Sequence, residues 1–330
     1  MIGRRAFLKS VSVAAAAGAA ATPGVARAKG AALTAVDVHP SDYPTVEAVR
    51  WMGSEIERET AGRLSVRIYA SGQLGTETDT VTLTRMGVLD ICRVTAAALN
   101  NAFPLTRALT LPFSYRDDAH MRSVVDGPIG AGIRESFSKR GLVALCFYDG
   151  GLRSIYNVRR QIHGPGDLRG LKIRAPRSDI FIEALNAMGA NATPLPFGEV
   201  FTGLQTHLID GAENNWSTFQ STRQYEAAPF WSDTEHAFSP DALLISKAVL
   251  DSMTPADRDL LREKALQSVP FMRGLWDAKQ AAARETVLAA GVRRNSVERA
   301  AFQRAVEPLL RRHAAEAELG ALMRRIHEHA

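Results

Sequence analysis

Hydrophobic and polar residues alternate over several short runs in the first half of the chain, and helix-like segments separate these runs. The strand-like runs are residues 34–38, 64–69, 89–94 and 142–148. The last run is almost entirely apolar, which predicts a strand covered on both faces. Helices are predicted over 41–60, with Ser41-Asp42 as the cap and Pro44 in the first turn, and over 76–86. Alternating strands and helices predict an open α/β architecture with parallel sheets.

The second half of the chain repeats this order of elements. Residues 171–174 and 242–246 have the pattern of strands, and residues 178–188 have the pattern of a helix. Helical composition then runs from the cap residue Thr254 to Ala290, with Pro270 inside it. A helix of that length would reach about 54 Å, which is longer than one domain is wide. Either Pro270 divides it, or a kinked helix lies across two domains.

Residues 1–28 are interpreted as a targeting sequence. Arg4-Arg5 precedes the small apolar run 11–21 and a cleavage-like site at 26–28, an order that resembles a twin-arginine export signal. The apolar run is too short and too rich in alanine to anchor the chain stably in a membrane. The alternative is an uncleaved amphipathic helix. If the signal is real, the folded protein is exported to the periplasm.

Removal of the signal changes the charge balance. The whole chain has 40 Lys and Arg against 35 Asp and Glu, and four of the cations lie in residues 1–28. The mature net charge is therefore +1, so the basic pI gives no indication of nucleic-acid binding. The 302 residues that remain are enough for two domains of ordinary size.

The sequence contains few of the groups that catalysis or metal binding requires. Cys92 and Cys146 lie in apolar runs and are interpreted as buried small residues, with a disulfide as the alternative in an oxidising compartment. No metal-ligand spacing, nucleophile elbow or phosphate loop occurs in the sequence. The glycines of 164–170 have the wrong spacing for a dinucleotide loop and predict a turn. We therefore expect a binding protein without cofactor or metal, rather than an enzyme.

Two arginines, Arg153 and Arg174, are candidates for binding an anion. Arg174 ends the strand-like run 171–174, and Ala175-Pro176 keeps the backbone that follows extended. Ligands of open α/β sheets bind at such strand ends. A planar guanidinium held there can bind a carboxylate through two parallel hydrogen bonds. The alternative is that both arginines form ordinary ion pairs at the surface.

Four linked motifs surround these arginines. They are G-x-R at 151–153, G-L-K-I-R-x-P at 170–176, P-x-P-F-x-E-V-F-x-x-L-Q-T at 194–206 and D-G-x-E-N at 210–214. In this order they resemble the solute receptors of tripartite ATP-independent periplasmic (TRAP) transporters. The similarity continues upstream, so that it covers nearly the whole mature chain, in residues 71–79, 111–116 and 126–130.

The resemblance implies a periplasmic-binding-protein (Venus flytrap) fold of two domains with open, mostly parallel sheets. Hinge strands would connect the domains, and one long helix would span both of them. The implied limits are 30–150 plus 239–278 for the first domain, and 151–238 plus 279–330 for the second.

The resemblance also implies which residues hold the ligand. Arg174 would hold a carboxylate, Arg153 would add a second cationic contact, and Asn214 would bond the carboxylate or an adjacent hydroxyl. His39 and Glu77, from the first domain, occupy positions at which family members contact the distal, hydroxylated part of the ligand. For these two residues the alternative is a solvated loop or a structural ion pair.

Four further residues are expected in the cleft. Phe197 matches the family's apolar wall. Arg93 is a cation in an otherwise apolar strand and is expected to reach the ligand, with a structural ion pair as the alternative. Asp149 and Asn215 would supply donors and acceptors for hydroxyl groups.

The arginine that holds the carboxylate needs support, because a loosely held guanidinium loses its orientation. Glu213 is the candidate partner of Arg174, and His236 is expected to complete the arrangement. Neither residue is expected to act as an acid or base catalyst.

The expected function is a periplasmic receptor that captures an organic acid and delivers it to the small and large membrane subunits of a TRAP transporter. The runs YDGGLRSIYN and GAENNW resemble the branch of the family associated with sugar acids. A hexuronate, glucuronate or galacturonate, is therefore the expected ligand. C4 dicarboxylates and 2-keto acids are the alternatives, together with a periplasmic enzyme acting on an organic acid and a partner of a sensor.

Overall fold

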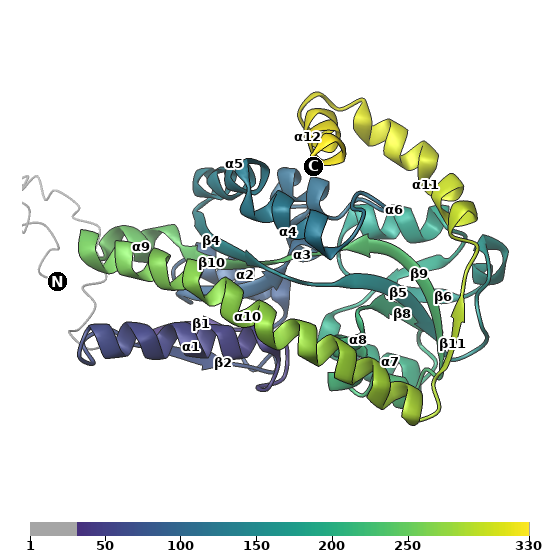
Figure 1. Ribbon diagram of the computed structural model, residues 1–330, viewed down its shortest axis with the longest axis horizontal. Helices are drawn as coiled ribbons and strands as arrows, with labels where there is room; N and C mark the ends of the chain where they lie inside the picture. Colours follow the sequence, from purple (N-terminus) through teal and green to yellow (C-terminus); the bar gives the residue numbers. More distant parts are fainter. Residues whose placement is uncertain (1–31, 330) are drawn as a thin grey trace, which may run out of the picture.

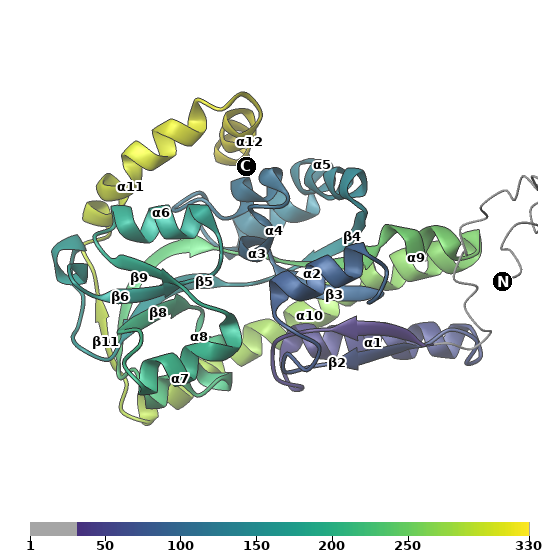
Figure 2. The same cartoon turned by 180° about the vertical axis from the view of Figure 1, so that it is seen from behind.

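The strands of the chain form two separate sheets (Figure 1). The computed structural model describes residues 32–329, so the predicted signal at 1–28 lies outside the described residues. The first sheet has the order β2-β1-β3-β10-β4, with strands at Val66–Tyr69, Leu33–Val36, Ile91–Thr95, Asp241–Ser246 and Leu142–Tyr148. The second has the order β11-β9-β5-β8-β6-β7, with strands at Arg293–Ser296, Phe230–Phe238, Leu152–Asn157, Gly211–Asn214, Lys172–Ala175 and Asn191–Pro194. Each sheet with the helices around it is called a lobe, and Figure 2 shows the two lobes at opposite ends of the molecule.

The prediction of open α/β sheets is confirmed, and the directions of the strands are mixed. Strand β1 runs parallel to β2 and β3, as the sequence pattern predicts. Antiparallel pairs all involve β10, between β3 and β4, or β5, between β8 and β9. These two strands begin where the chain enters a lobe from the other one. Hydrophobic periodicity indicates which face of a strand is buried but not its direction.

Helices cover both sheets. In the first lobe they are α1 (Pro44–Glu59), α2 (Glu77–Arg85), α3 (Ala96–Leu99), α4 (Asp118–Asp126), α5 (Pro128–Ser136) and α9 (Lys247–Ser252), with 3-10 turns at Pro104–Leu109 and Phe137–Arg140. In the second they are α6 (Asp179–Ala187), α7 (Val200–Gln205) and α8 (Trp216–Ser221), with 3-10 turns at Pro165–Leu168, Phe197–Glu199 and Gln224–Glu226. The turn predicted within 164–170 is thus confirmed.

The starts of α1 and α2 differ in how they are capped. Thr76 caps α2, because its side chain accepts from the Asp79 amide and the Asp79 side chain in turn accepts from the Thr76 amide. The predicted Ser41-Asp42 cap of α1 is wrong. Tyr43 occupies the cap position, where its side chain makes no capping hydrogen bond to the described helix, and its ring is buried instead.

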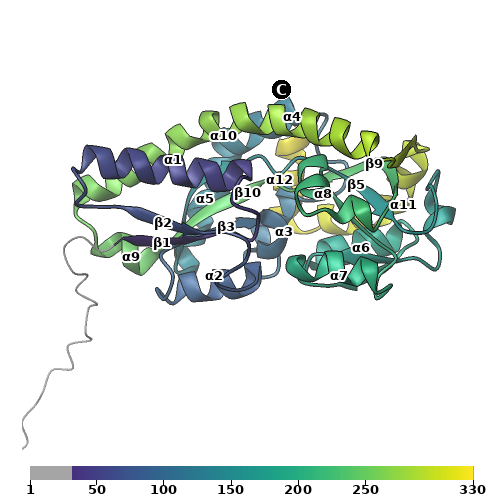
Figure 3. The same ribbon diagram turned by 90° about the horizontal axis from the view of Figure 1, so that it is seen from below.

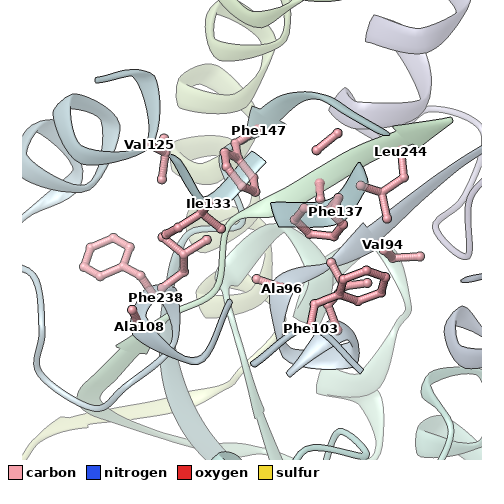
Figure 4. Packing of buried hydrophobic residues seen from close by; sticks show 14 of the residues in the cluster. Val94, Ala96, Phe103, Ala108, Val125, Ile133, Phe137, Phe147, Phe238 and Leu244 are labelled. Carbon is pink, nitrogen blue, oxygen red and sulfur yellow. The ribbon is translucent and has the colours of Figure 1, made fainter. Parts of the chain in front are cut away.

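Aromatic residues fill the core of the first lobe (Figure 4). Phe103 and Phe137 stack with their ring centroids 4.5 Å apart. Ile133 of α5 and Phe147 of β4 belong to the same buried cluster. The two cysteines are buried and free, so the interpretation of both as small core residues is confirmed and the disulfide is wrong.

One long helix, α10 (Pro255–Ala289), lies across both lobes (Figures 1 and 3). It packs against α1 of the first lobe and α8 of the second, which confirms the predicted spanning helix. Pro270 removes one backbone donor, but Leu266, four residues earlier, is exposed, so water can bond the freed carbonyl. No helix in the described residues, α10 included, is both long and apolar enough to cross a bilayer.

The C-terminal helices divide between the lobes. Helix α11 (Arg299–Ala314) packs on α6 and β9 of the second lobe. Helix α12 (Ala317–Glu328) returns to the first lobe, where Leu319, Leu322 and Ile326 join the aromatic core. The predicted limits place 279–330 in the second domain, so α12 departs from them because its apolar face has its partners in the first lobe. The other limits stay predictions.

The two short crossovers between the sheets touch each other. One is residues 149–151, between β4 and β5, and the other is residues 239–240, between β9 and β10. A methyl group at Gly150 would lie 1.7 Å from the carbonyl oxygen of Ser239. The backbones can therefore approach this closely only because residue 150 is glycine.

We predict that Gly150→Ala destabilises the protein by about 3 kcal/mol or more, since the clash is with backbone that cannot move aside. Gly166→Ala is the matched control, because nothing lies within 4 Å of the added methyl group. It should change the unfolding free energy by less than about 0.5 kcal/mol. Urea unfolding measures both variants, and equal stability of the two would contradict the close approach of the crossovers.

Candidate functional site

A cavity lies between the two lobes. The first lobe contributes Val38, His39, Tyr43, Glu77, Thr95 and Asp241, the crossover contributes Gly150, and the second lobe contributes Arg153, Arg174, Pro176, Phe197, Asn214, Asn215 and Thr218. Small-molecule sites usually lie in clefts between domains of this kind. The cavity brings together seven of the nine residues predicted to contact the ligand.

On the second-lobe wall, Arg153 of β5 is paired with Glu213 of the neighbouring strand β8. Its Nη2 donates to Glu213 Oε1 at 2.7 Å, and its Nη1 donates to Asn214 Oδ1 at 3.0 Å. Burial alone would raise the pKa of Glu213, but the charge and hydrogen bonds of Arg153 outweigh it and hold the pKa at about 2. Glu213 is therefore a buried carboxylate that neutralises Arg153.

The predicted pairing of Glu213 with Arg174 is wrong. Glu213 stands opposite Ile155 in the β5–β8 register, which brings it next to the Arg153 side chain. His236 lies beside this pair, with its Nε2 3.5 Å from Glu213 Oε2 and its Nδ1 2.9 Å from Thr234 Oγ1. Its Nε2 makes no hydrogen bond with any described residue, so His236 packs beside the Arg153–Glu213 pair without bonding it.

Arg174, at the end of β6, is buried, and no described residue forms an ion pair with it. Its Nε donates to the Leu195 carbonyl oxygen at 2.9 Å, and the side chain lines the cavity. Within residues 32–329, no carboxylate lies at ion-pair distance from its guanidinium. Burial lowers the pKa of Arg174, with Glu213 opposing the decrease and Arg153 adding to it. The second-lobe wall therefore carries one uncompensated positive charge.

Arg93 does not reach the cavity, so its predicted contact with the ligand is corrected. It is 1% exposed, and its Nε donates to Asp37 Oδ2 at 2.8 Å. Its Nη2 lies against Asp37 Oδ1 and His39 Nδ1. The central position of β3 places this cation among carboxylates behind the wall, where it organises the residues that do line the cavity.

His39 is a neutral ring with a predictable tautomer. Burial and the Arg93 charge lower its pKa to about 4, against the effect of Asp37. Its Nδ1 lies 3.2 Å from Asp37 Oδ1 and closer to Arg93 Nη2. Because a guanidinium can only donate, the closer contact favours Nδ1 as the acceptor and places the ring proton on Nε2. The ring stacks on Tyr43 at 3.9 Å between centroids and lies 5.0 Å from Phe197. The first lobe therefore supplies a neutral hydrogen-bond donor.

Two carboxyl groups line the first-lobe wall, and one of them was not predicted. Glu77, at the start of α2, accepts from the Thr95 amide at 2.9 Å, and burial raises its pKa. Asp241 is the unpredicted residue, and burial raises its pKa to about 7, with Arg93 opposing and Glu77 adding to the effect. Its position just after the crossover Ser239-Pro240 was the available signal in the sequence.

Asp149 was also predicted to contact the ligand, but it does not line the cavity. It is part of the hinge. Its carboxylate accepts from Arg122 Nε of α4 at 2.6 Å and from Arg273 Nε of α10 at 3.0 Å. The prediction that it contacts ligand hydroxyls is corrected, because both of its oxygens bind cations on the other side of the crossover.

Direct contacts join the lobes around the cavity. Tyr43 Oη and Thr218 Oγ1 are 2.9 Å apart, and Asn100 bonds Ser178 Oγ at 2.8 Å. Tyr43 and Thr218 were missed from the sequence, because partners 175 residues apart leave no local pattern. The lobes are thus closed on each other. In the described part of the chain, no group of three His, Cys, Asp or Glu side chains is arranged to hold a metal ion.

Comparisons with known proteins agree with this geometry. The family profile described as "Bacterial extracellular solute-binding protein, family 7" matches residues 35–317. A solute-binding protein of Chromohalobacter salexigens is 33% identical over 274 residues, which are 83% of this chain and 82% of that protein.

Solved structures are similar over nearly the whole chain. A TRAP periplasmic solute-binding protein of Xanthobacter autotrophicus Py2, with bound β-D-galacturonate, is 45% identical at a TM-score of 0.88, covering 90% of this chain and 100% of that one. One of Citrobacter koseri, with bound D-glucuronate, is 33% identical at a TM-score of 0.88, covering 90% and 99%. This chain therefore belongs to family 7 of the bacterial extracellular solute-binding proteins, the solute-binding proteins of TRAP transporters.

Proposed function

We propose that the protein is the periplasmic receptor of a TRAP transporter and that it binds a hexuronate, galacturonate or glucuronate, in the cavity between its lobes. The observation that carries this proposal is the unpaired guanidinium of Arg174 on the cavity wall. A buried cation without a counter-ion is unfavourable, and a ligand carboxylate removes that cost. Arg153, which Glu213 already neutralises, can add a hydrogen bond without adding net charge.

The balance of charge favours one carboxylate over two. The second-lobe wall has a single excess positive charge, from Arg174. The first lobe presents Glu77 and Asp241, with Asp37 behind them, against the one guanidinium of Arg93. A second ligand carboxylate on that side would meet like charges, whereas hydroxyl groups would meet hydrogen-bond acceptors. This arrangement supports a sugar acid over a C4 dicarboxylate.

The solved relatives support the same class of ligand. Galacturonate is bound in the relative that is 45% identical, and glucuronate in the one that is 33% identical. Besides the arginines, the cavity offers Asn214, Asn215 and the donor of His39 for hydroxyl groups. A C4 dicarboxylate and a 2-keto acid use fewer of these groups.

The proposal also covers export of the protein, delivery of the ligand to the membrane subunits and the absence of any chemical change in the ligand. Residues 1–28 would direct twin-arginine export to the periplasm, and the closed lobes would be the form that the small and large membrane subunits recognise. No step of the proposed function changes the ligand chemically, so the purified protein should return an added hexuronate intact.

A ligand screen tests the proposed class. D-galacturonate or D-glucuronate should raise the unfolding temperature, by an amount that corresponds to about 2.7 kcal/mol when the ligand is at 100 times its Kd. Succinate and pyruvate, at the same concentration, should raise it less. A larger shift with either of these acids would show that the site is built for another ligand.

The charge of Arg174 should be essential for binding. We predict that Arg174→Ala weakens galacturonate binding at least about 100-fold, since two charge-assisted hydrogen bonds contribute about 3 kcal/mol or more. The free variant should be as stable as the wild type, because no residue among 32–329 forms an ion pair that the substitution would break. Titration calorimetry measures the affinity, with the exposed Arg169→Ala as control. Unchanged affinity of Arg174→Ala would contradict the assignment.

Glu213 should stabilise the protein in a pH-dependent way. Its pKa of about 2 in the folded protein lies below the ordinary glutamate value of 4.5. The stabilisation, about 3 kcal/mol, is therefore fully present above pH 4.5 and lost as the pH falls toward 2. We predict that Glu213→Gln lowers the unfolding free energy at pH 7 and that the difference from wild type narrows between pH 4.5 and 3.

The exposed Glu298, paired with Arg304, provides the control for this measurement. Glu298→Gln should change the unfolding free energy by less than about 1 kcal/mol. A constant difference between wild type and Glu213→Gln from pH 7 to pH 3 would show that the carboxylate does not stabilise Arg153.

A further inference from the structure

Asp241 has an unusual position for a buried carboxyl group. It is the first residue of β10, directly after the crossover, and it lines the cavity while being only 4% exposed. Of the described residues, only Arg93 forms an ion pair with it, at 3.3 Å from Nη1 to Oδ2. That contact lacks hydrogen-bond geometry, since Arg93 Nη1 has no hydrogen-bond partner among the described residues. The carboxyl oxygens of Asp241 therefore retain their capacity to bond a ligand.

The other carboxyl groups of this wall are already held by the protein. Asp37 receives two donors of Arg93, and Glu77 accepts from the Thr95 amide. The charged and titratable groups that act on Asp241 come from the loop after β1, α2, β3, β5 and the cap of α1. They are Asp37, Glu77, Arg93, Arg153 and Tyr43. His39 lines the same cavity. Arg93 alone cannot satisfy three carboxyl groups, so Asp241 has the greatest need of a further partner.

We propose that Asp241 is a specificity-determining residue of the cavity, where it forms a hydrogen bond with a ligand hydroxyl on the side opposite Arg174. This inference rests on the proposed binding of a hexuronate and extends it from the carboxylate to the sugar ring. A ligand without that hydroxyl would leave the buried carboxyl of Asp241 unbonded, and such a defect is strongly unfavourable. The residue therefore selects hydroxylated acids over plain keto acids and dicarboxylates.

The protonation of Asp241 is compatible with either direction of this hydrogen bond. Burial raises its pKa to about 7, so both forms are present at neutral pH. The ionised carboxylate accepts from a hydroxyl, and the protonated carboxyl can donate to one. A sugar hydroxyl can donate to the ionised form and accept from the protonated form, whereas a second ligand carboxylate cannot do both.

A double-mutant cycle tests this contact directly, with the Asp241 side chain removed as one change and a ligand hydroxyl removed as the other. Asp241→Ala should weaken binding of D-galacturonate by tenfold or more, and Asp241→Asn, which retains an acceptor oxygen, should weaken it less. The same variants are titrated with galacturonates that lack one hydroxyl each. Asp241→Ala should bind the analogue lacking the recognised hydroxyl as tightly as it binds D-galacturonate, because the variant has no contact with that hydroxyl to lose, whereas the wild type should bind this analogue more weakly than D-galacturonate.

Control measurements separate the possible outcomes. Asp233→Ala, which removes a carboxylate bonded to Trp231 and Arg294 outside the cavity, should leave affinity unchanged. At pH 8 the free Asp241 variants should unfold at or above the wild-type temperature, since the ionised form of Asp241 is buried.

Three results would count against one or the other claim. Failure of the wild type to bind any hexuronate would overturn the proposed function itself. Equal affinity of wild type and Asp241→Ala for D-galacturonate would overturn only the role of Asp241. An equal loss for every deoxy analogue would also overturn it, because Asp241 would then act through Arg93 rather than touch the ligand.

Discussion

The cavity depends on a difference between two neighbouring arginines. Arg153 is neutralised by Glu213, whereas Arg174 is buried with one hydrogen bond, to the Leu195 carbonyl oxygen, and no ionic partner in the described chain. Two paired arginines would leave the wall neutral, and two unpaired ones would repel each other. With Arg153 paired and Arg174 unpaired, the wall requires a single anion. Arg153 lies beside that anion's position as a second hydrogen-bond donor.

The groups of the first lobe determine the orientation in which a ligand bound to Arg174 can lie. Arg93 is placed behind the wall and gathers the carboxyl groups around it, so that the ligand meets Glu77, Asp241 and a neutral His39. The cavity is therefore cationic on one wall and rich in acceptors on the other. A molecule with a carboxylate at one end and hydroxyl groups at the other fits this polarity in a single orientation. Touching crossovers and the spanning helix α10 hold the two walls opposite each other.

Much of the fold could be predicted from the sequence, because periodicity, caps and linked motifs are local signals. The strands, the spanning helix and the cavity positions of Arg174, Arg153 and Asn214 were accessible in this way. The ion-pair partners of the buried charged residues could not be predicted, since they depend on the register in which the strands pair. Glu213 faces Arg153 because of how β5 pairs with β8, and no pattern in the sequence fixes that pairing. For the same reason the sequence revealed neither the burial of Arg93 nor the cavity position of Asp241.

The central claim is that an excess positive charge at Arg174 receives the acidic end of a sugar acid. A crystal structure of the protein with D-galacturonate tests this most directly. The account predicts the ligand carboxylate within about 3 Å of the Arg174 guanidinium, in a bidentate arrangement, with the ring hydroxyls toward the first lobe. A carboxylate bound on the first-lobe side, or a ligand outside the cavity between the lobes, would contradict it.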